Sequence, residues 1–322
     1  MSIGLRARRA ITGTLTTLGP DSEITRAVVK RTCAQRGIAC TFTTNYVALK
    51  KGLCEIRLPL NQTMFAPYIA SYFDTFADSV TGETSNSGFR VVDFSTPRLH
   101  HYVQFDAGFE LPSFPESIDF AEEYFRRGAP AEGSLVFDLG ANVGLVSYAL
   151  SRSVGSTGSV IAFEPDPVSL NYLARNLARH SCGNVTVVAA AISDTKGTFD
   201  FFAEGTITSG LASTRKDAIM TKTQGSVISC DAITLGDAFE TYGIPAWIKM
   251  DIEGAELSVL EQSRDLLRQT KPFLVIDTSH TVGDDTTASR VEKILQSAGY
   301  STETRQPGGS QLTWAQHGGF TR

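Results

Sequence analysis

The sequence predicts an α/β fold in which a doubly wound, mostly parallel sheet is covered by helices on both faces. Strand-like apolar runs alternate with amphipathic segments from Ser134 onward, as expected for consecutive βαβ units with right-handed crossovers. A glycine-rich bend connects the first of these runs directly to a helix. Four runs end on charged residues, and open α/β sheets bind ligands at the carboxyl ends of their strands. The pattern therefore predicts both the fold and the edge of the sheet at which a site lies.

Residues 1–115 are expected to form a mixed α/β accessory region. A helix is predicted from Asp21 to Gly37, where apolar residues recur at helical spacing. Residues rich in β-branched and aromatic side chains predict strands at 41–49, 55–60, 89–94 and 99–105, with a helix at 66–80 among them. His100 and His101 are neighbours in one of these strands, so they point to opposite faces and cannot bind one metal ion together.

Residues 116–322 are expected to form the main domain. A helix is predicted at 116–127, and strands are predicted at 135–139, 159–163, 185–189, 198–202, 246–251 and 272–276, with helices after most of them. The polar segment 203–225 shows no periodicity and is read either as a substrate lid or as an unstructured loop. Residues 300–304 and 311–315 flank a Pro-Gly-Gly sequence, which predicts an antiparallel hairpin at the C-terminal end of the sheet.

The glycine-rich bend follows Asp138 and consists of Gly140, Ala141, Asn142, Val143 and Gly144. We expect such a bend to point backbone N–H groups and one carboxylate at a ligand. A dinucleotide site has a third glycine and accepts a pyrophosphate at the helix N-terminus, where a carboxylate at position 138 would repel it. A carboxylate suits a cationic ligand without phosphate, and S-adenosylmethionine has both properties.

A second acid, Glu164, ends the next predicted strand, about 20 residues beyond the bend. A carboxylate at that position can accept hydrogen bonds from the two hydroxyls of a ribose. Asp166 has a simpler explanation, because it precedes Pro167 and is expected to cap the following helix.

Lys249 and Asp251 stand two residues apart in the predicted strand 246–251 and therefore share a face. A central parallel strand is buried on both faces, and a buried lysine needs a partner. We favour an internal ion pair of Lys249, with either Asp251 or Asp138, over a direct catalytic role for the lysine.

Three residues near the ends of the fourth and fifth predicted strands are candidates for a general base: in order, Asp251, His280 and Glu253. His280 is of interest because an imidazole takes up a proton near neutral pH. Glu256 is read as an acid that favours a helix N-terminus through the helix dipole. No pair or triplet of residues has the close spacing of metal ligands, so a metal-independent reaction is expected.

The amino-acid composition limits the kinds of molecule that the protein is expected to bind. The chain has 322 residues, 42% of them hydrophobic and 20% charged, with a formal net charge of -5. This acidic balance and the absence of a basic stripe argue against nucleic acid as a partner and favour a small or neutral substrate. No run approaches the roughly 18 apolar residues of a membrane span. The five cysteines lack the close pairs of zinc sites, and a cytoplasmic location is expected, with a homodimer left open.

Four sequence motifs together resemble the FkbM family of S-adenosylmethionine-dependent methyltransferases. They are VFDLGANVG at 136–144, FEP at 163–165, AISD at 191–194 and, most specifically, IKMDIEGAE at 248–256. The resemblance extends over roughly residues 134–280. It implies a class I methyltransferase fold, which is Rossmann-like and has an antiparallel C-terminal hairpin. It also implies methylation of a hydroxyl on a sugar, glycolipid or polyketide-type natural product.

The resemblance also implies roles for individual residues. Asp138 and the bend, with Gly140, Ala141, Asn142 and Gly144, would hold the methionine part of the donor. Glu164 would hold the ribose, Ile192, Ser193 and Asp194 would border the adenine, and Asp251 would lie beside the donor. Asp277 departs from the family pattern, in which a glutamate often follows the fifth strand.

Three other functions compete with O-methyl transfer as an interpretation of the sequence. A catalytically silent scaffold or regulatory subunit would not require the acids at positions 138 and 164 or Asn142. An NAD-dependent epimerase or dehydrogenase is disfavoured by Asp138 and by the missing third glycine. Methylation of RNA is disfavoured by the acidic charge balance.

Overall fold

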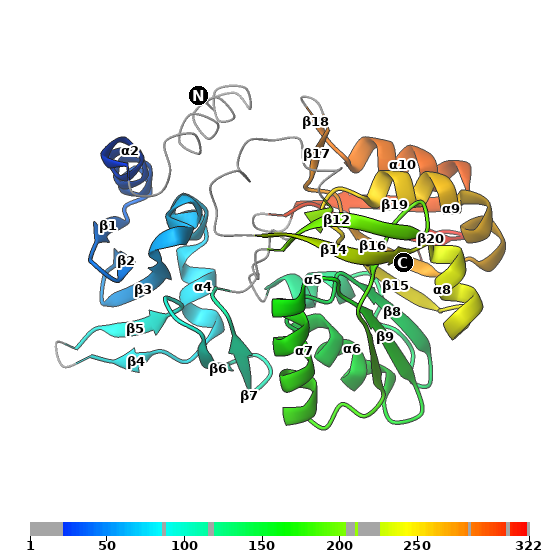
Figure 1. Cartoon of the computed structure of the whole chain (residues 1–322), viewed down its shortest axis with the longest axis horizontal. Coiled ribbons are helices and arrows are strands. Elements are labelled where there is room, and N and C mark those ends of the chain that lie inside the picture. The colour runs from blue at the N-terminus through cyan, green and yellow to red at the C-terminus, as the bar shows by residue number, and fades with distance from the viewer. Residues whose placement is uncertain are drawn as a thin grey trace. The chain divides into compact units, whose positions relative to one another are not determined.

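The computed structural model describes residues 22–85, 88–114, 119–203, 210–211, 226–282, 285–306 and 310–320 (Figure 1). These residues form two compact units, the first ending at Phe114 and the second beginning at Asp119. Each unit has its own sheets and helices and is described by itself.

The N-terminal unit contains a five-stranded sheet with the strand order β1-β2-β3-β5-β4. Its strands are β1 (Ala39–Phe42), β2 (Tyr46–Lys51), β3 (Cys54–Pro59), β4 (Glu83–Thr84) and β5 (Arg90–Asp93). Neighbouring strands are antiparallel except β3 and β5. The helices are α2 (Glu23–Ala34), η1 (Leu60–Phe65), α3 (Ala66–Ser71) and α4 (Phe73–Ser79), and β6 (Arg98–Tyr102) forms a separate hairpin with β7 (Ala107–Leu111).

Two elements predicted for this unit are each divided in the structure. The strand predicted at 41–49 is the hairpin of β1 and β2, because the Oγ1 of Thr43 accepts a hydrogen bond from the N–H of Tyr46 and closes a turn. The helix predicted at 66–80 breaks at Tyr72, whose φ of -122° and ψ of 33° are not helical. Strand β7 was not predicted. In β6, His100 is buried and His101 is exposed, which confirms that their side chains face opposite sides.

The C-terminal unit contains a seven-stranded sheet with the order β10-β9-β8-β15-β16-β20-β19. Its strands are β8 (Leu135–Leu139), β9 (Ser159–Phe163), β10 (Val185–Val188), β15 (Trp247–Met250), β16 (Phe273–Asp277), β19 (Tyr300–Arg305) and β20 (Leu312–His317). All pairs are parallel except those made by β20. The predicted parallel sheet and its antiparallel C-terminal hairpin are confirmed.

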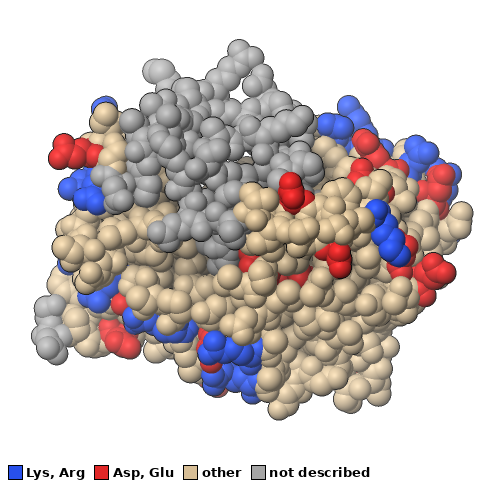
Figure 2. Space-filling model, in the orientation of Figure 1, with Lys and Arg blue, Asp and Glu red and all other residues tan. Residues whose placement is uncertain are grey.

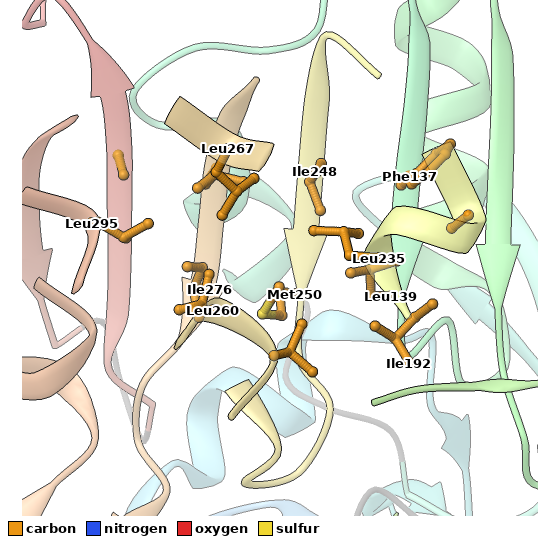
Figure 3. Packing of buried hydrophobic residues seen from close by; sticks show 14 of the residues in the cluster. Phe137, Leu139, Ile192, Leu235, Ile248, Met250, Leu260, Leu267, Ile276 and Leu295 are labelled. Atoms are coloured by element: carbon orange, nitrogen blue, oxygen red, sulfur yellow. The ribbon is translucent and has the colours of Figure 1, made fainter. Parts of the chain in front are cut away.

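Helices cover both faces of this sheet. They are α5 (Asp119–Phe125), α6 (Leu145–Val154), α7 (Pro167–Arg179), α8 (Leu235–Tyr242), α9 (Glu256–Thr270) and α10 (Ala288–Ser297). Phe137, Leu139, Ile248, Met250 and Ile276 point to one side and pack with apolar residues of α8, α9 and α10 (Figure 3). The alternate residues Val136, Val160, Trp247 and Val275 pack with α5 and α6 on the other side. Burial on both faces explains why the central strands are continuously apolar in sequence.

A second, four-stranded sheet in this unit has the order β11-β14-β12-β13. Its strands are β11 (Ala191–Ile192), β12 (Gly197–Ala203), β13 (Gly210–Leu211) and β14 (Ser226–Ile233). Strand β14 and helix α8 were not predicted, although Thr234 and Asp237 form a capping box at the start of α8. The strand predicted at 198–202 lies within β12, where the side chain of Phe201 is buried. Most of the segment predicted as a lid, residues 204–209 and 212–225, lies outside the described residues.

Acidic and basic side chains are interspersed over α9 and α10 of the C-terminal unit (Figure 2). Asp265 lies within ion-pair distance of Arg264 and Arg268, and Glu261 pairs with Arg290 between the two helices. In the part of the chain that the structure describes, no helix combines the length and apolar character needed to cross a bilayer.

Candidate active site

The backbone N–H groups of the bend between β8 and α6 form hydrogen bonds within the protein. All five N–H groups of residues 140–144 donate to acceptors of the protein. Gly140 and Ala141 donate to the carbonyl of Phe163 at 3.0 and 2.9 Å, Asn142 to Oε2 of Glu164 at 2.7 Å, Val143 to Oδ1 of Asn142 at 2.6 Å and Gly144 to the carbonyl of Ala141 at 2.9 Å. The expectation that these N–H groups point at a ligand is therefore wrong. A bend with bonded donors is poorly suited to a pyrophosphate, which agrees with a phosphate-free ligand.

The glycines of the bend allow two close approaches. Gly140 has a φ of 80°, and a Cβ there would lie 1.9 Å from the carbonyl oxygen of Asp251. Gly144 has a φ of 90°, and a Cβ there would lie 2.6 Å from the Leu173 side chain. Asn142 between them has a φ of 49°, a left-handed conformation that asparagine tolerates better than most residues. The bend therefore packs directly against the chain that follows β15.

Replacing Gly140 by alanine is expected to destabilise the unit through both the positive φ and the contact with Asp251. Gly318 is a matched control, because its φ is 85° and no atom lies within 4 Å of the added Cβ. Gly318→Ala should cost about 1–2 kcal/mol from backbone strain alone. Gly140→Ala should cost about 1–3 kcal/mol more from overpacking, measured by chemical denaturation. Equal losses in the two variants would show that the close approach is unimportant.

Glu164 lies directly after β9 and is buried. Its Oε1 accepts a hydrogen bond from the N–H of Asp166 at 2.8 Å, and its Oε2 accepts the one from Asn142. Burial raises the pKa of Glu164 to about 7, although both backbone donors oppose the shift. Asp166 itself caps α7 by accepting from the N–H groups of Val168 and Ser169, as predicted. Glu164 thus holds the bend through Asn142 and presents a carboxyl at the edge of the sheet.

Asp138 and Lys249 face each other across β8 and β15, and both are almost completely buried. The Nζ of Lys249 lies 3.3 Å from Oδ1 of Asp138 and donates to the carbonyl of Gly140 at 2.6 Å. The hydroxyl of Ser147 on α6 donates to Oδ2 of Asp138 at 2.6 Å. The predicted internal ion pair is present, and Asp138, rather than Asp251, is the partner. Through Gly140, the pair also holds the start of the bend.

Asp251, Glu253 and His280 come together where β15 and β16 end. One ligand-type atom from each residue lies within 4.8 Å of those from the other two. The Nε2 of His280 lies 3.3 Å from Oε2 of Glu253, and its Nδ1 lies 3.3 Å from Oε1 of Glu256. Glu253 has a φ of 58°, a strained conformation of the kind that is concentrated at functional sites. The three residues predicted as general-base candidates therefore form one cluster.

Charges in this cluster shift several pKa values. Burial raises the pKa of Asp277 to about 7, and the neighbouring Asp251 carboxylate adds to the shift. Burial also raises the pKa of Glu256, which the charge of His280 opposes. Burial disfavours the imidazolium of His280, but Glu256 and Glu253 outweigh it and raise the pKa of His280 well above its ordinary value. A ring that keeps its proton is a weaker candidate for a base than the sequence suggests.

The residues predicted to border the adenine begin in β11 of the second sheet, and Ile192 packs in the same apolar cluster as Leu139 and Met250 of the main sheet. Ile192 and Ser193 are buried, and the N–H of Ser193 donates to the carbonyl of Ile233, which extends the pairing of β11 with β14. The hydroxyl of Ser193 donates to Oδ1 of Asp194 at 3.1 Å. The backbone of this segment is thus fixed by the second sheet.

Two residues of the site were not predicted to contribute to it. The hydroxyl of Tyr124 on α5 lies 3.5 Å from Oδ2 of Asp251, although the sequence marks Tyr124 only as an apolar position of a helix. Glu256 accepts hydrogen bonds from the N–H groups of Ile252 and Gly254 at the start of α9 and also contacts His280. Its predicted place at a helix N-terminus is confirmed, but the contact with His280 depends on tertiary structure.

The strand order of the main sheet, with β20 reversed between β16 and β19, is that of a class I methyltransferase. The glycine bend after β8 and the acid after β9 occupy the edge at which such sheets bind their ligand. The model of the Methyltransferase FkbM domain matches residues 138–302, just over half of the 322 residues. The chain belongs to the FkbM family of S-adenosylmethionine-dependent methyltransferases, and S-adenosylmethionine is its cofactor.

Several solved structures are similar to this chain. The FkbM methyltransferase from Methylobacillus flagellatus KT is 21% identical with a TM-score of 0.42, and the match covers 56% of this chain and 43% of that protein. This chain thus spans less than half the length of that relative. A precorrin-6y C5,15-methyltransferase from Geobacter metallireducens GS-15 is 13% identical, with a TM-score of 0.41 and coverage of 63% and 88%. TYW2 from M. jannaschii, in complex with AdoMet, is 16% identical, with a TM-score of 0.39 and coverage of 69% and 85%. No curated protein matches the chain.

Proposed function

We propose that this protein is an O-methyltransferase that acts on a hydroxyl of a sugar, glycolipid or polyketide-type natural product. The observation that carries the proposal is the packing of Gly140 against the carbonyl of Asp251. This contact brings the start of the donor-site bend next to the Asp251, Glu253 and His280 cluster. The methyl donor and the hydroxyl that accepts the methyl group would therefore meet at one edge of the main sheet.

The donor site we propose consists of Asp138, the bend from Gly140 to Gly144, Glu164 and residues 192–194. Glu164 would accept hydrogen bonds from the ribose hydroxyls, since each of its oxygens has capacity beyond the single backbone donor that it receives. The pair of Asp138 and Lys249 would hold the bend in place. The bonded N–H groups of the bend fit a sulfonium nucleoside better than a pyrophosphate.

Bound S-adenosylmethionine supplies a methyl group whose bond to sulfur breaks with the electron pair remaining on sulfur, while a new bond forms to the acceptor oxygen. The protein aligns the two reactants, and positioning of this kind contributes about 7–11 kcal/mol in favourable cases. The hydroxyl proton must leave, and Asp251 is our first candidate to accept it, ahead of His280 and Glu253. The acceptor is proposed to be a small molecule or glycan, the location cytoplasmic and a homodimer an alternative to the monomer.

Binding and turnover experiments test this function. Calorimetric titration of the full chain with S-adenosylhomocysteine should give saturable binding at one site. Incubation with methyl-labelled donor and a panel of sugars, glycolipids and polyketides should label at least one acceptor with a hydroxyl. Absence of both heat and thermal shift with S-adenosylhomocysteine would instead support a silent scaffold.

Donor binding is also expected to depend on pH through Glu164. Burial and the charge of Asp166 raise its pKa to about 7, and the backbone donors of Asp166 and Asn142 and the charge of Lys249 oppose the shift. The ionised carboxylate accepts from both ribose hydroxyls, whereas the protonated form has lost one acceptor. Affinity for S-adenosylhomocysteine should therefore fall about tenfold between pH 8 and pH 6. Glu164→Gln should bind more weakly and with no such pH dependence, and an identical slope in both proteins would contradict this assignment.

A further inference from the structure

We propose that Asp251, Glu253 and His280 form a binding site for one divalent cation of the Mn²⁺ type. The three residues provide two carboxylates and one imidazole, and their ligand-type atoms lie within 4.8 Å of one another. Neighbouring donors of one such ion are separated by about 3.0 Å and opposite donors by about 4.3 Å, so the three side chains would draw closer together when the ion binds. Carboxylates suit Mg²⁺ and Mn²⁺, whereas an imidazole favours transition metals, and Mn²⁺ satisfies both preferences.

Glu256 provides a second, independent observation that points to a cation. A histidine that binds a metal through one ring nitrogen usually donates the N–H of its other ring nitrogen to a carboxylate, a backbone carbonyl or water, which orients the ring. In this protein, Nε2 of His280 faces Glu253, and Nδ1 lies 3.3 Å from Oε1 of Glu256. Glu256 is fully buried, and its Oε2 has no hydrogen-bond partner among the described residues. A buried carboxylate in this position is well explained as the orienting partner of a metal ligand.

The balance of charge leads to the same inference. Asp251, Glu253, Glu256 and Asp277 all act on His280 or on one another at the ends of β15 and β16. Lys249, the cation nearest in sequence, is committed to Asp138 and to the carbonyl of Gly140 on β8. A cluster of carboxylates that has one imidazole between them therefore gains strongly from a divalent ion. The sequence does not reveal this site, because His280 lies 27 residues beyond Glu253 and reaches it only through the pairing of β15 with β16.

The role of the ion rests on the proposed function, whereas its binding does not. Three protein ligands leave positions for oxygen atoms of the acceptor, so the site favours a substrate with two adjacent oxygens, such as a vicinal diol. An ion held there would lower the pKa of a hydroxyl bound to it. With Asp251 engaged as a ligand, the hydroxyl proton would leave to solvent water, and the acceptor oxygen would form its bond to the methyl carbon as the bond between carbon and sulfur breaks.

Titration of the full chain with Mn²⁺, after treatment with EDTA, tests the inference by calorimetry and by electron paramagnetic resonance. We expect one Mn²⁺ per chain and a loss of affinity of at least tenfold in both Glu253→Gln and His280→Gln. Glu261→Gln is the matched control, because it changes an exposed carboxylate on the same helix, α9, and should bind Mn²⁺ as the parent does. If His280→Gln does not fold, Glu253→Gln decides, because the amide of glutamine has nearly the same shape as the carboxylate that it replaces.

The metal inference and the proposed function fail in different ways. No saturable Mn²⁺ binding, or unchanged affinity in Glu253→Gln, would overturn the metal site. If S-adenosylhomocysteine still binds in that case, the proposed donor site stands and only the cation site is wrong. If Mn²⁺ binds and S-adenosylhomocysteine does not, the cation site stands and the proposed function is wrong.

Discussion

Replacing Lys249 by methionine will lower the free energy of unfolding by about 3–5 kcal/mol, because it leaves a buried charge without its partner. Asp138 is 0% exposed and Lys249 is 2% exposed, so water cannot replace the lost ammonium group. Ser147 would remain as a hydrogen-bond donor to Asp138, and the carbonyl of Gly140 would lose the donor that holds it. Urea denaturation followed by far-ultraviolet circular dichroism measures the loss.

Two further variants separate the cost of a buried charge from the loss of a side chain. The double variant Asp138→Asn with Lys249→Met removes both charges and should recover part of the stability. Arg290→Met breaks the exposed pair with Glu261 and should cost no more than about 1 kcal/mol. If Lys249→Met costs as little as Arg290→Met, the pair of Asp138 and Lys249 does not stabilise the sheet.

Replacing Glu164 by glutamine will weaken the binding of S-adenosylhomocysteine by about 10–100-fold at pH 8. Hydrogen bonds to a charged group contribute about 1.5–3 kcal/mol, and each 1.4 kcal/mol corresponds to a factor of ten in affinity. The glutamine also has an NH₂ group facing one of the N–H groups of Asn142 and Asp166, which now donate to the carboxylate. Isothermal titration calorimetry measures the change.

Glu132→Gln is the matched control for this prediction, since Glu132 is an exposed glutamate of the same unit. It should leave the affinity for S-adenosylhomocysteine unchanged. Loss of thermal stability must be measured for both variants, because Glu164 also holds the bend. An affinity for Glu164→Gln equal to that of the parent would contradict the proposed donor site.

Most of the C-terminal fold could be predicted from the sequence, because its elements are determined locally. The central strands are buried on both faces and therefore read as continuous apolar runs, while the helices between them show helical spacing. Strand β14 could not be recognised in this way, since its sequence SVISCDAI mixes polar and apolar residues without a continuous apolar run, and it pairs with β11 and β12 of the second sheet. In the N-terminal unit, the strand expected at 41–49 was divided by a turn that depends on one threonine side chain.

The site could be predicted in part. The acids at the ends of β8, β9, β15 and β16 follow from strand patterns, and the structure brings Asp251, Glu253 and His280 together. The interaction partners of each charged group could not be predicted, because they are distant in sequence. Asp138 has Lys249 as its partner, and Glu256 lies against His280. The N–H groups of the bend were expected to face a ligand, but Phe163 of β9 and Glu164, directly after this strand, accept hydrogen bonds from three of them.

The hydrogen bonds that fix the bend after β8 affect how the protein would bind a ligand. The backbone N–H groups of this loop already form hydrogen bonds, so the loop loses its conformational entropy when the protein folds. Binding of a ligand therefore requires little further ordering of the loop. Its amide protons should then exchange slowly with solvent even in the ligand-free protein. The protein would be rigid where it binds the methyl donor. Any conformational change on binding would be confined to the residues that recognise the methyl acceptor.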